Sequence, residues 1–184
     1  MIKLLQKVAG IKRMSAITFK FDRAKAIETI LYLASRINSE CEVYGICKLL
    51  YFADKLSLEN YGRFLFGDSY VAMEQGSTPS EAYDLLKPST QTPYLRIDGN
   101  NVIPLRDADL DYFSKSDIKC LDKIIERDNR EKSKKYRWEE AHDDAWDKTW
   151  NKRGSRKSKN ISVESIAKTL GESDDIIDYL LNSG

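Results

Sequence analysis

Apolar residues recur at helical spacing in two consecutive segments near the N-terminus. Asp22 precedes the first segment, where a helix N-cap belongs, and Gly62 follows the second as a C-cap glycine. Residues 39–42 form a short link between them. The spacing predicts two amphipathic helices that pack antiparallel as the centre of the fold. Their apolar positions are Ala26, Ile27, Ile30, Leu31, Ala34 and Ile37 in the first helix, and Ile46, Leu49, Leu50, Ala53 and Leu56 in the second.

Short extended segments follow this helical pair. Gly67 and Asp68 are typical of a turn, and the β-rich sequence SYVAMEQG after them predicts a strand near residues 69–75. Further on, YLRIDGNNVIPL has alternating apolar residues on both sides of the turn sequence DGNN. This pattern predicts a hairpin near residues 94–105.

A short helix is predicted between the strand and the hairpin. The sequence TPSEAYDLLKP places Thr78 as the N-cap and Pro79 at the first helical position. Glu81 can then bond back to the backbone of the cap, as in a capping box.

The C-terminal half returns to helical spacing. SKSDIKCLDKIIERDNRE begins with Ser114 and Asp117, which resemble a capping box, and predicts a third long helix. Two short helices around Gly171 end the chain, and Ser173 caps the second. Between the third helix and this C-terminal pair, YRWEEAHDDAWDKTW predicts a fourth helix whose aromatic and histidine rings recur every four residues. Those rings belong to Trp138, His142, Trp146 and Trp150.

These elements predict a mainly α protein, a compact multi-helix domain with a small β insertion. We divide the chain into an N-terminal extension at 1–18, a helical domain at 19–150, a basic loop at 151–160 and a helical pair at 161–184 packed on the same domain.

Composition and charge narrow the class of protein. The chain is 41% apolar and 10% aromatic, which excludes wholesale disorder, and its 32% of charged residues predict a well-solvated surface. Thirty basic side chains face 29 acidic ones, for a net charge of +1. This balance does not indicate a globally basic DNA-binding protein.

Cysteine use and the N-terminus predict the compartment. Cys41, Cys47 and Cys120 form no C-x-x-C pair, and the chain has a single histidine. We therefore expect free thiols in a reducing cytoplasm and no metal site. The first residues contain no long apolar run and no small-residue cleavage site, so we expect neither a signal peptide nor a membrane span. Met1 and Met14 are alternative starts.

No constellation of residues requires an enzyme. Gly62, Gly67 and Gly76 match neither phosphate-binding glycine pattern, so we expect no nucleotide and no other cofactor. The single histidine, His142, lies in an acidic helical segment among tryptophans, where a structural role is the commoner one. We therefore expect a protein without catalytic residues.

The chain also has one local basic segment. It could contact nucleic acid together with the C-terminal helices, but the final helix begins with the acidic sequence DD, which would repel phosphate. We therefore do not expect a nucleic-acid partner, although such a regulator remains the alternative function. The basic side chains are Lys152, Arg153, Arg156, Lys157 and Lys159.

Protein recognition is the remaining function, and the stretch from Tyr61 to Leu86 is the candidate surface. It is rich in Tyr, Phe, Met and Arg, residue types that suit interface anchors. Packing of Tyr70, Met73 and Tyr83 into the core is the equally weighted alternative. The candidate contact residues are Arg63, Tyr70, Met73, Glu74, Gln75, Ser77, Thr78 and Tyr83.

Three segments of this chain carry a resemblance to a known family. KAIETILYLASR, KLLYFADKLSLENYGRFLFGDSYVAMEQGSTPSEAYDLL and WEEAHDDAW resemble the Panacea domain of SocA-like antitoxins, a family that includes GepA-type phage-associated proteins. The resemblance runs from about Phe19 to the C-terminus. Many members have Gly-Pro-Val-Pro where this chain has GSTP. The positions that we assign to the structural motif are Asp54, Gly62, Gly67, Asp68, Gly76, Pro79, Glu81, His142 and Trp146.

The resemblance implies a mainly helical domain without enzymatic activity, in a toxin–antitoxin operon or a prophage. It implies a cognate toxin as the partner, neutralised by direct binding. SocA-like members also imply a bacterial protease to which the toxin is presented. We expect no membrane partner.

Overall fold

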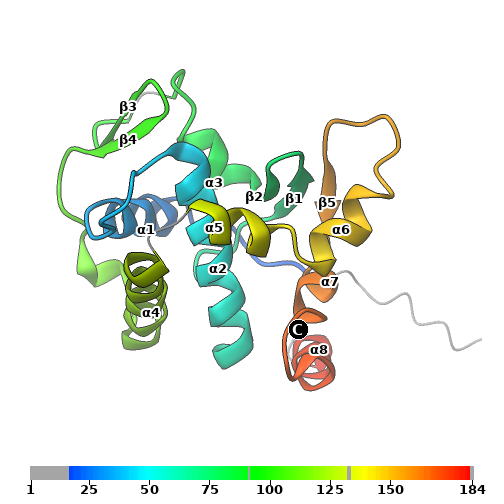
Figure 1. Ribbon diagram of the computed structural model, residues 1–184. Coiled ribbons are helices and arrows are strands. Elements are labelled where there is room, and N and C mark those ends of the chain that lie inside the picture. Colours follow the sequence, from blue (N-terminus) through cyan, green and yellow to red (C-terminus); the bar gives the residue numbers. More distant parts are fainter. Residues whose placement is uncertain (1–16, 91, 132–133, 183–184) are drawn as a thin grey trace, which may run out of the picture.

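The computed structural model describes residues 17–90, 92–131 and 134–182. All but the last two residues of the predicted extension, 1–18, therefore lie outside the described residues. The fold is mainly α with small β elements, as the sequence predicts (Figure 1). In chain order the elements are α1 (Arg23–Ala34), α2 (Val43–Tyr61), β1 (Tyr70–Met73), β2 (Gly76–Pro79), α3 (Ser80–Leu85), β3 (Leu95–Asp98), β4 (Asn101–Pro104), the 3₁₀ helix η1 (Leu110–Tyr112), α4 (Lys115–Glu131), α5 (Lys134–Ala141), α6 (Asp144–Trp150), β5 (Lys159–Ile161), α7 (Val163–Ala167) and α8 (Ser173–Asn182).

Helix α2 is the centre of the molecule and contacts α1, α4, α5, α7 and β2. Its predicted end is confirmed, because Gly62 adopts the left-handed conformation with φ of 62°. The predicted N-cap of α1 is also confirmed, since Asp22 Oδ1 accepts a hydrogen bond of 3.0 Å from the amide of Lys25.

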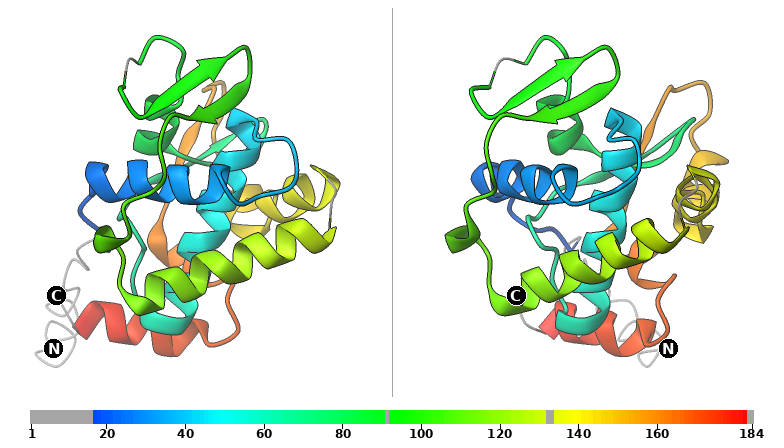
Figure 2. Two further views of the ribbon diagram at one scale, coloured as in Figure 1. Left: turned by 90° about the vertical axis from the view of Figure 1, so that its left-hand side faces the viewer. Right: turned by 60° about the vertical axis from the view of Figure 1, so that its left-hand side comes forward.

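The predicted antiparallel packing of these two helices is wrong. Helix α1 crosses α2 at a steep angle in both views of Figure 2. The cause is that α2 is buried around most of its circumference, so several elements share its surface and no single helix lies along it. The connection is also longer than expected, because α1 already ends at Ala34 and α2 begins at Val43.

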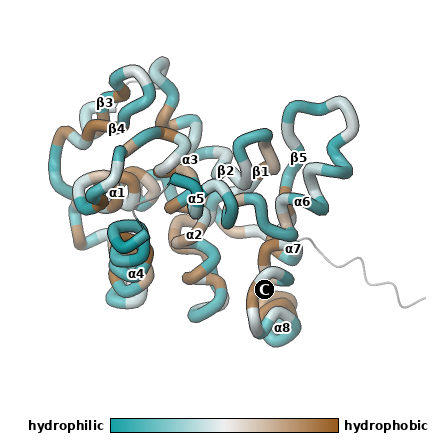
Figure 3. Tube along the Cα trace, in the orientation of Figure 1, coloured by the Kyte–Doolittle hydropathy of each residue, from teal (hydrophilic) through white to brown (hydrophobic). Residues whose placement is uncertain are grey.

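The predicted single strand is one member of a three-stranded antiparallel sheet with the order β2-β1-β5. Strands β1 and β2 form a hairpin in which Met73 pairs with Gly76, and β5 pairs with the other edge of β1. The end of the predicted basic loop at 151–160 therefore belongs to the sheet. The rest of that connection between α6 and β5 is strongly hydrophilic (Figure 3).

The predicted capping box of α3 is wrong. Thr78 lies in β2, where it pairs with Val71, and its hydroxyl donates to the carbonyl of Gly76. Its side chain is therefore held inside the sheet and makes no cap. Asp68 caps the helix instead, because its carboxylate accepts from the amides of Glu81 (3.0 Å) and Ala82 (2.8 Å).

The predicted elements that follow are largely confirmed. Strands β3 and β4 form the expected hairpin. Helix α4 begins with the expected capping box: the amide of Ser114 donates to Asp117 Oδ2 and the amide of Asp117 donates to Ser114 Oγ. Helices α7 and α8 flank Gly171, although Ser173 is the first residue of α8 and not its cap.

The predicted fourth helix is two helices, α5 and α6. The break falls at His142 and Asp143 because the Asp143 carboxylate accepts from the amides of Ala145 and Trp146, both at 3.1 Å, and starts a new helix there. The ridge of rings nevertheless continues across the break.

Candidate partner-binding surface

The two-residue turn between β1 and β2 consists of Glu74 and Gln75, whose side chains are both exposed. Gly76 after the turn has φ of +96°, a conformation that side chains disfavour. A Cβ atom at Gly76 would lie 2.9 Å from the carbonyl oxygen of Ala141. The absence of a side chain therefore lets the turn pack directly against the end of α5.

The ring of Trp146 on α6 and that of His142, between α5 and α6, contact the backbone at this turn. The ring of His142 lies between Trp138, with centroids 4.0 Å apart, and Trp146, with centroids 4.2 Å apart. Trp146 Nε1 donates to the carbonyl of Met73 at 2.7 Å. His142 Nε2 lies 3.2 Å from the carbonyl of Glu74, and His142 Nδ1 lies 2.6 Å from that of Trp138. Both nitrogens of the histidine thus contact backbone carbonyls, and the turn is fixed in position.

Exposed aromatic side chains flank the turn. Trp138 is 53% exposed and Tyr44 is 40% exposed. Tyr44 stacks on the half-buried Tyr83, with ring centroids 6.2 Å apart. Sequence reasoning missed Tyr44 and counted Trp138 only as part of a packed ridge. The available signal was that Tyr44 lies two residues before Ile46, away from the apolar face of α2.

A pocket of about 210 Å³ connects the turn with these aromatic residues. It is lined by Glu42, Tyr44, Gly45, Lys48, Gln75, Lys134, Arg137 and Trp138.

Lys48 of α2 lines this pocket and is only 4% exposed. Its ammonium group donates to the carbonyl of Ser77 at 3.0 Å and to Thr78 Oγ1 at 3.4 Å. Burial lowers the pKa of Lys48 to about 8, because the charged form loses hydration.

We call the pocket together with Glu74 and Tyr83 the turn surface.

The predicted contact residues divide into three groups. Glu74 and Gln75 are exposed, and Met73 and Tyr83 are half-buried, so these four lie on or beside the turn surface. Tyr70, Ser77 and Thr78 are buried in the interior, where a partner cannot contact their side chains. For Tyr70 the alternative of core packing is therefore the observed one.

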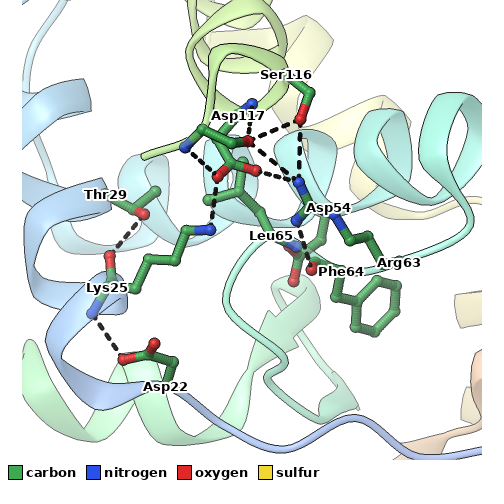
Figure 4. A network of polar contacts seen from close by, with 10 residues as sticks. Asp22, Lys25, Thr29, Asp54, Arg63, Phe64, Leu65, Ser116 and Asp117 are labelled. Carbon is green, nitrogen blue, oxygen red and sulfur yellow. Dashed lines mark hydrogen bonds and ion pairs between the residues drawn. The ribbon is translucent and has the colours of Figure 1, made fainter. Parts of the chain in front are cut away.

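Arg63, the remaining predicted contact residue, lies in a separate ionic cluster (Figure 4). Its Nη2 atom is 2.7 Å from Asp117 Oδ1, while Lys25 Nζ is 2.6 Å from Asp117 Oδ2. Asp117 is buried, and these two cations lower the pKa of its carboxyl group although burial opposes them. Arg63 thus joins the end of α2 to α4.

Asp54, a predicted structural-motif residue, is fully buried on α2. Its Oδ1 atom accepts from the amide of Leu65 at 2.6 Å, and its Oδ2 atom accepts from the hydroxyl of Tyr70 at 2.8 Å. Burial raises the pKa of Asp54 to about 7, more than these hydrogen bonds lower it. The carboxyl group therefore ties the loop after α2 and strand β1 to the core.

A second pocket, of about 480 Å³, is lined by residues of α2, α4 and α5 and by residues after α7. Phe52 and Leu56 of α2, Ile124 of α4 and Leu170 after α7 supply its apolar lining. Ion pairs lie at this pocket: Lys55 Nζ is 2.7 Å from Asp143 Oδ2, and Arg127 pairs with Glu140. None of the predicted contact residues lines this pocket.

The thiols and acidic groups of the described residues form no metal-binding cluster of three or more candidate ligands. Cys41, Cys47 and Cys120 are free thiols. Burial raises the pKa of Cys47 to about 12 and that of Cys41 to about 11. Within the same described residues, every helix is too short or too polar to cross a membrane.

Comparison with known proteins identifies a family. The family model described as "Antitoxin SocA-like, Panacea domain" matches residues 46–147, which is more than half of the chain. The match includes most of α2, the hairpin of β1 and β2, α5 and most of α6. Searches of curated proteins and of solved structures found no match. The chain belongs to the SocA-like antitoxin family and contains its Panacea domain.

Proposed function

We propose that this protein is the antitoxin of a toxin–antitoxin system and neutralises a cognate toxin by binding it directly. Membership of the SocA-like antitoxin family supports an antitoxin-type role. We further propose that it acts without catalysis and in the cytoplasm. The contacts of both His142 nitrogens with backbone carbonyls support the first point, and the three free thiols suit a reducing compartment.

One observation supports the proposed location of the binding site. The turn of Glu74 and Gln75 has its backbone fixed by Trp146 and its side chains exposed between large aromatic residues. A rigid polar tip beside exposed Tyr and Trp side chains suits protein recognition, because little conformational entropy is lost on binding.

Co-expression with the product of the neighbouring gene tests this proposal. The wild-type chain is expected to restore growth to cells that express the toxin and to bind the toxin in purified form. The double variant Glu74→Ala/Gln75→Ala and the single variant Trp138→Ala are each expected to weaken binding at least tenfold, while circular dichroism and the melting temperature stay close to wild type.

A matched control is Lys157→Ala, which removes an exposed side chain of the connection between α6 and β5. It is expected to leave toxin binding unchanged. Loss of rescue with Lys157→Ala but not with Glu74→Ala/Gln75→Ala would place the contact elsewhere. A neighbouring gene product that is not toxic, or a wild-type chain that does not restore growth, would contradict the antitoxin function itself.

We also propose, from the family alone, that binding presents the toxin to a bacterial protease. The half-life of the toxin in growing cells measures this step. It is expected to shorten when the wild-type chain is co-expressed and to stay long with Glu74→Ala/Gln75→Ala. A toxin that is neutralised while its half-life is unchanged would leave sequestration as the mechanism.

Nucleic-acid binding is a second candidate function because basic groups gather at one more pocket. Lys152, Lys159 and Lys168 line it together with Asp144 and Lys148, which pair with each other at 3.1 Å. The site is expected to bind a DNA duplex with an affinity that falls steeply with salt concentration. A gel shift that survives neutralisation of Lys152, Arg153, Arg156 and Lys157 would exclude this loop as the contact.

A further inference from the structure

The charge of Lys48 has no anionic partner among the residues that the structure describes. Burying an ammonium group is costly unless an opposite charge compensates it. The two atoms to which Lys48 Nζ donates, the carbonyl oxygen of Ser77 and the hydroxyl oxygen of Thr78, are both neutral. No carboxylate of the described parts of the chain forms an ion pair with Lys48. Since its pKa is about 8, the side chain is mostly charged at neutral pH.

A second cation in the same pocket has unused donors. Arg137 Nε and Nη2 bind Asp128 at 2.6 Å each, and Nη2 also contacts Ser39. Nη1 donates no hydrogen bond to any residue that the structure describes. It lies against Gly45 in the pocket wall, where a Cβ atom would be only 2.4 Å away. The missing side chain of Gly45 therefore makes room for this guanidinium nitrogen.

The other charged residues of the pocket are paired. Glu42 is the acidic member of the lining, and its Oε1 atom lies 2.8 Å from Lys134 Nζ. Lys134 also pairs with Glu40 outside the pocket. Lys134 thus serves two carboxylates, which leaves one negative charge at the edge of the pocket. Among the cations that line the pocket, Lys48 is the one without a carboxylate partner in the described residues, and Arg137 Nη1 is a donor without an acceptor there.

We propose that this pocket binds the carboxylate of an acidic side chain of the partner protein, with Lys48 Nζ and Arg137 Nη1 as donors. The proposal rests on the proposed function and deepens it, because it names the chemistry of the partner at the turn surface. The carboxylate is the anion that Lys48 lacks, and charge-assisted hydrogen bonds hold it in the pocket. Tyr44 and Trp138 line the mouth of the pocket and can contact the methylene groups of a Glu side chain.

Binding of small model compounds tests the proposal without any toxin. The probe is N-acetylglutamate amide, which carries the side-chain carboxylate alone, and N-acetylglutamine amide is its neutral counterpart of the same shape. Titration of the full-length chain is followed by NMR at the Gly45 amide and the Trp138 indole N–H. We expect saturable shifts with a Kd on the order of 1 mM for the glutamate probe. We expect binding of the neutral probe to be at least tenfold weaker.

A third probe distinguishes the carboxylate of an acidic side chain from the carboxylate at the C-terminus of a partner. N-acetylglutamine with a free α-carboxylate imitates a C-terminus. Equal or tighter binding of this compound would overturn the assignment to an acidic side chain.

Two lysine variants complete the test. Lys48→Met keeps the length of the side chain without its charge and is expected to weaken binding of the glutamate probe at least tenfold. Lys152→Met removes an equal charge from the connection between α6 and β5 and is expected to bind as the wild type does. Non-saturable shifts, equal responses to the charged and neutral probes, or unchanged binding by Lys48→Met would overturn the proposal. If Lys48→Met fails to fold, the comparison of the probes on the wild type still decides.

Failure of this proposal and failure of the antitoxin function are distinguishable. A pocket that binds the glutamate probe in a chain that does not rescue cells would contradict only the antitoxin function. A chain that restores growth of the cells but whose pocket does not bind the glutamate probe would contradict only the carboxylate site.

Discussion

Trp146 Nε1 donates a hydrogen bond of 2.7 Å to the carbonyl oxygen of Met73, a residue 73 positions away in the sequence. This bond links α6 to the last residue of β1. The exposed turn therefore depends on a helix outside the sheet for the position of its backbone. Strand β5 pairs with β1 only up to Ala72, so this link supports the hairpin beyond the end of that pairing, next to the turn.

Trp146→Phe is expected to lower the free energy of unfolding by about 1–2 kcal/mol, because the Met73 carbonyl loses its donor. Amide exchange at Glu74 and Gln75 is expected to accelerate by more than global unfolding accounts for. The matched control is Trp150→Phe. Trp150 contacts Trp146 and Arg153 through its ring, and its indole nitrogen has no acceptor among the described residues. Equal acceleration in both variants would contradict the role of the hydrogen bond.

Gly76→Ala is expected to destabilise the fold by about 2–4 kcal/mol, as measured by urea unfolding. The new Cβ atom combines an unfavourable φ of +96° with a distance of 2.9 Å to the Ala141 carbonyl. Gly99→Ala is the control, because Gly99 also has positive φ (60°) but open space around it. It is expected to cost about 1 kcal/mol. Similar costs at the two sites would show that the turn does not pack tightly on α5.

Asp68→Asn is expected to cost about 1–2 kcal/mol, since one of the amides at the start of α3 loses its acceptor. Glu81→Ala is expected to change stability by less than about 0.5 kcal/mol, because the side chain of Glu81 is exposed. The capping box that the sequence suggests would give the opposite order. Thermal unfolding of the two variants therefore decides which residue caps the helix.

Asp54→Asn is expected to flatten the pH dependence of stability. The pKa of Asp54 is about 7 in the folded chain, against roughly 3.9 when unfolded. Its contribution to stability is fully present below the unfolded pKa and is lost as the pH rises through the folded pKa. The difference in unfolding free energy between wild type and variant should thus shift in favour of the variant from about pH 4 to 7. A difference that is constant over this range would contradict burial of a protonated Asp54.

The sequence predicts the parts of this fold that depend on neighbouring residues. The Asp22 cap of α1, the Gly62 end of α2 and the Ser114–Asp117 box of α4 each involve positions at most three or four apart, and all three are present. The hairpin of β3 and β4 follows from its own turn sequence in the same way. Local chemistry sufficed for these elements.

The remaining features depend on residues that are far apart in the sequence. Asp68 caps a helix that begins 12 positions later at Ser80, across a complete hairpin. Strand β5 carries Lys159 and Asn160 and becomes a strand only because β1 offers it an edge. Burial of Thr78 likewise follows from its pairing with Val71 in the sheet.

Only part of the candidate site was predicted, because the rest also depends on residues that are far apart in the sequence. Glu74 and Gln75 were among the predicted contact residues, although the sequence placed them in a strand and not in a turn. The pocket beside them needs Lys48 and Tyr44 of α2 and Arg137 and Trp138 of α5. Local pattern cannot reveal that α5 lies beside the start of α2. The signal available in the sequence was the aromatic residue Tyr44, which lies off the predicted apolar face of α2.

The cap that Asp68 supplies to α3 also has a consequence for the order of folding. The amides of Glu81 and Ala82 find their acceptor only after β1 and β2 have reversed the chain and returned it to residue 68. Hairpin and helix thus close one loop, and we expect them to fold as a single cooperative unit. A fragment that begins after Asp68 would retain the sequence of α3 but lose the residue that starts the helix.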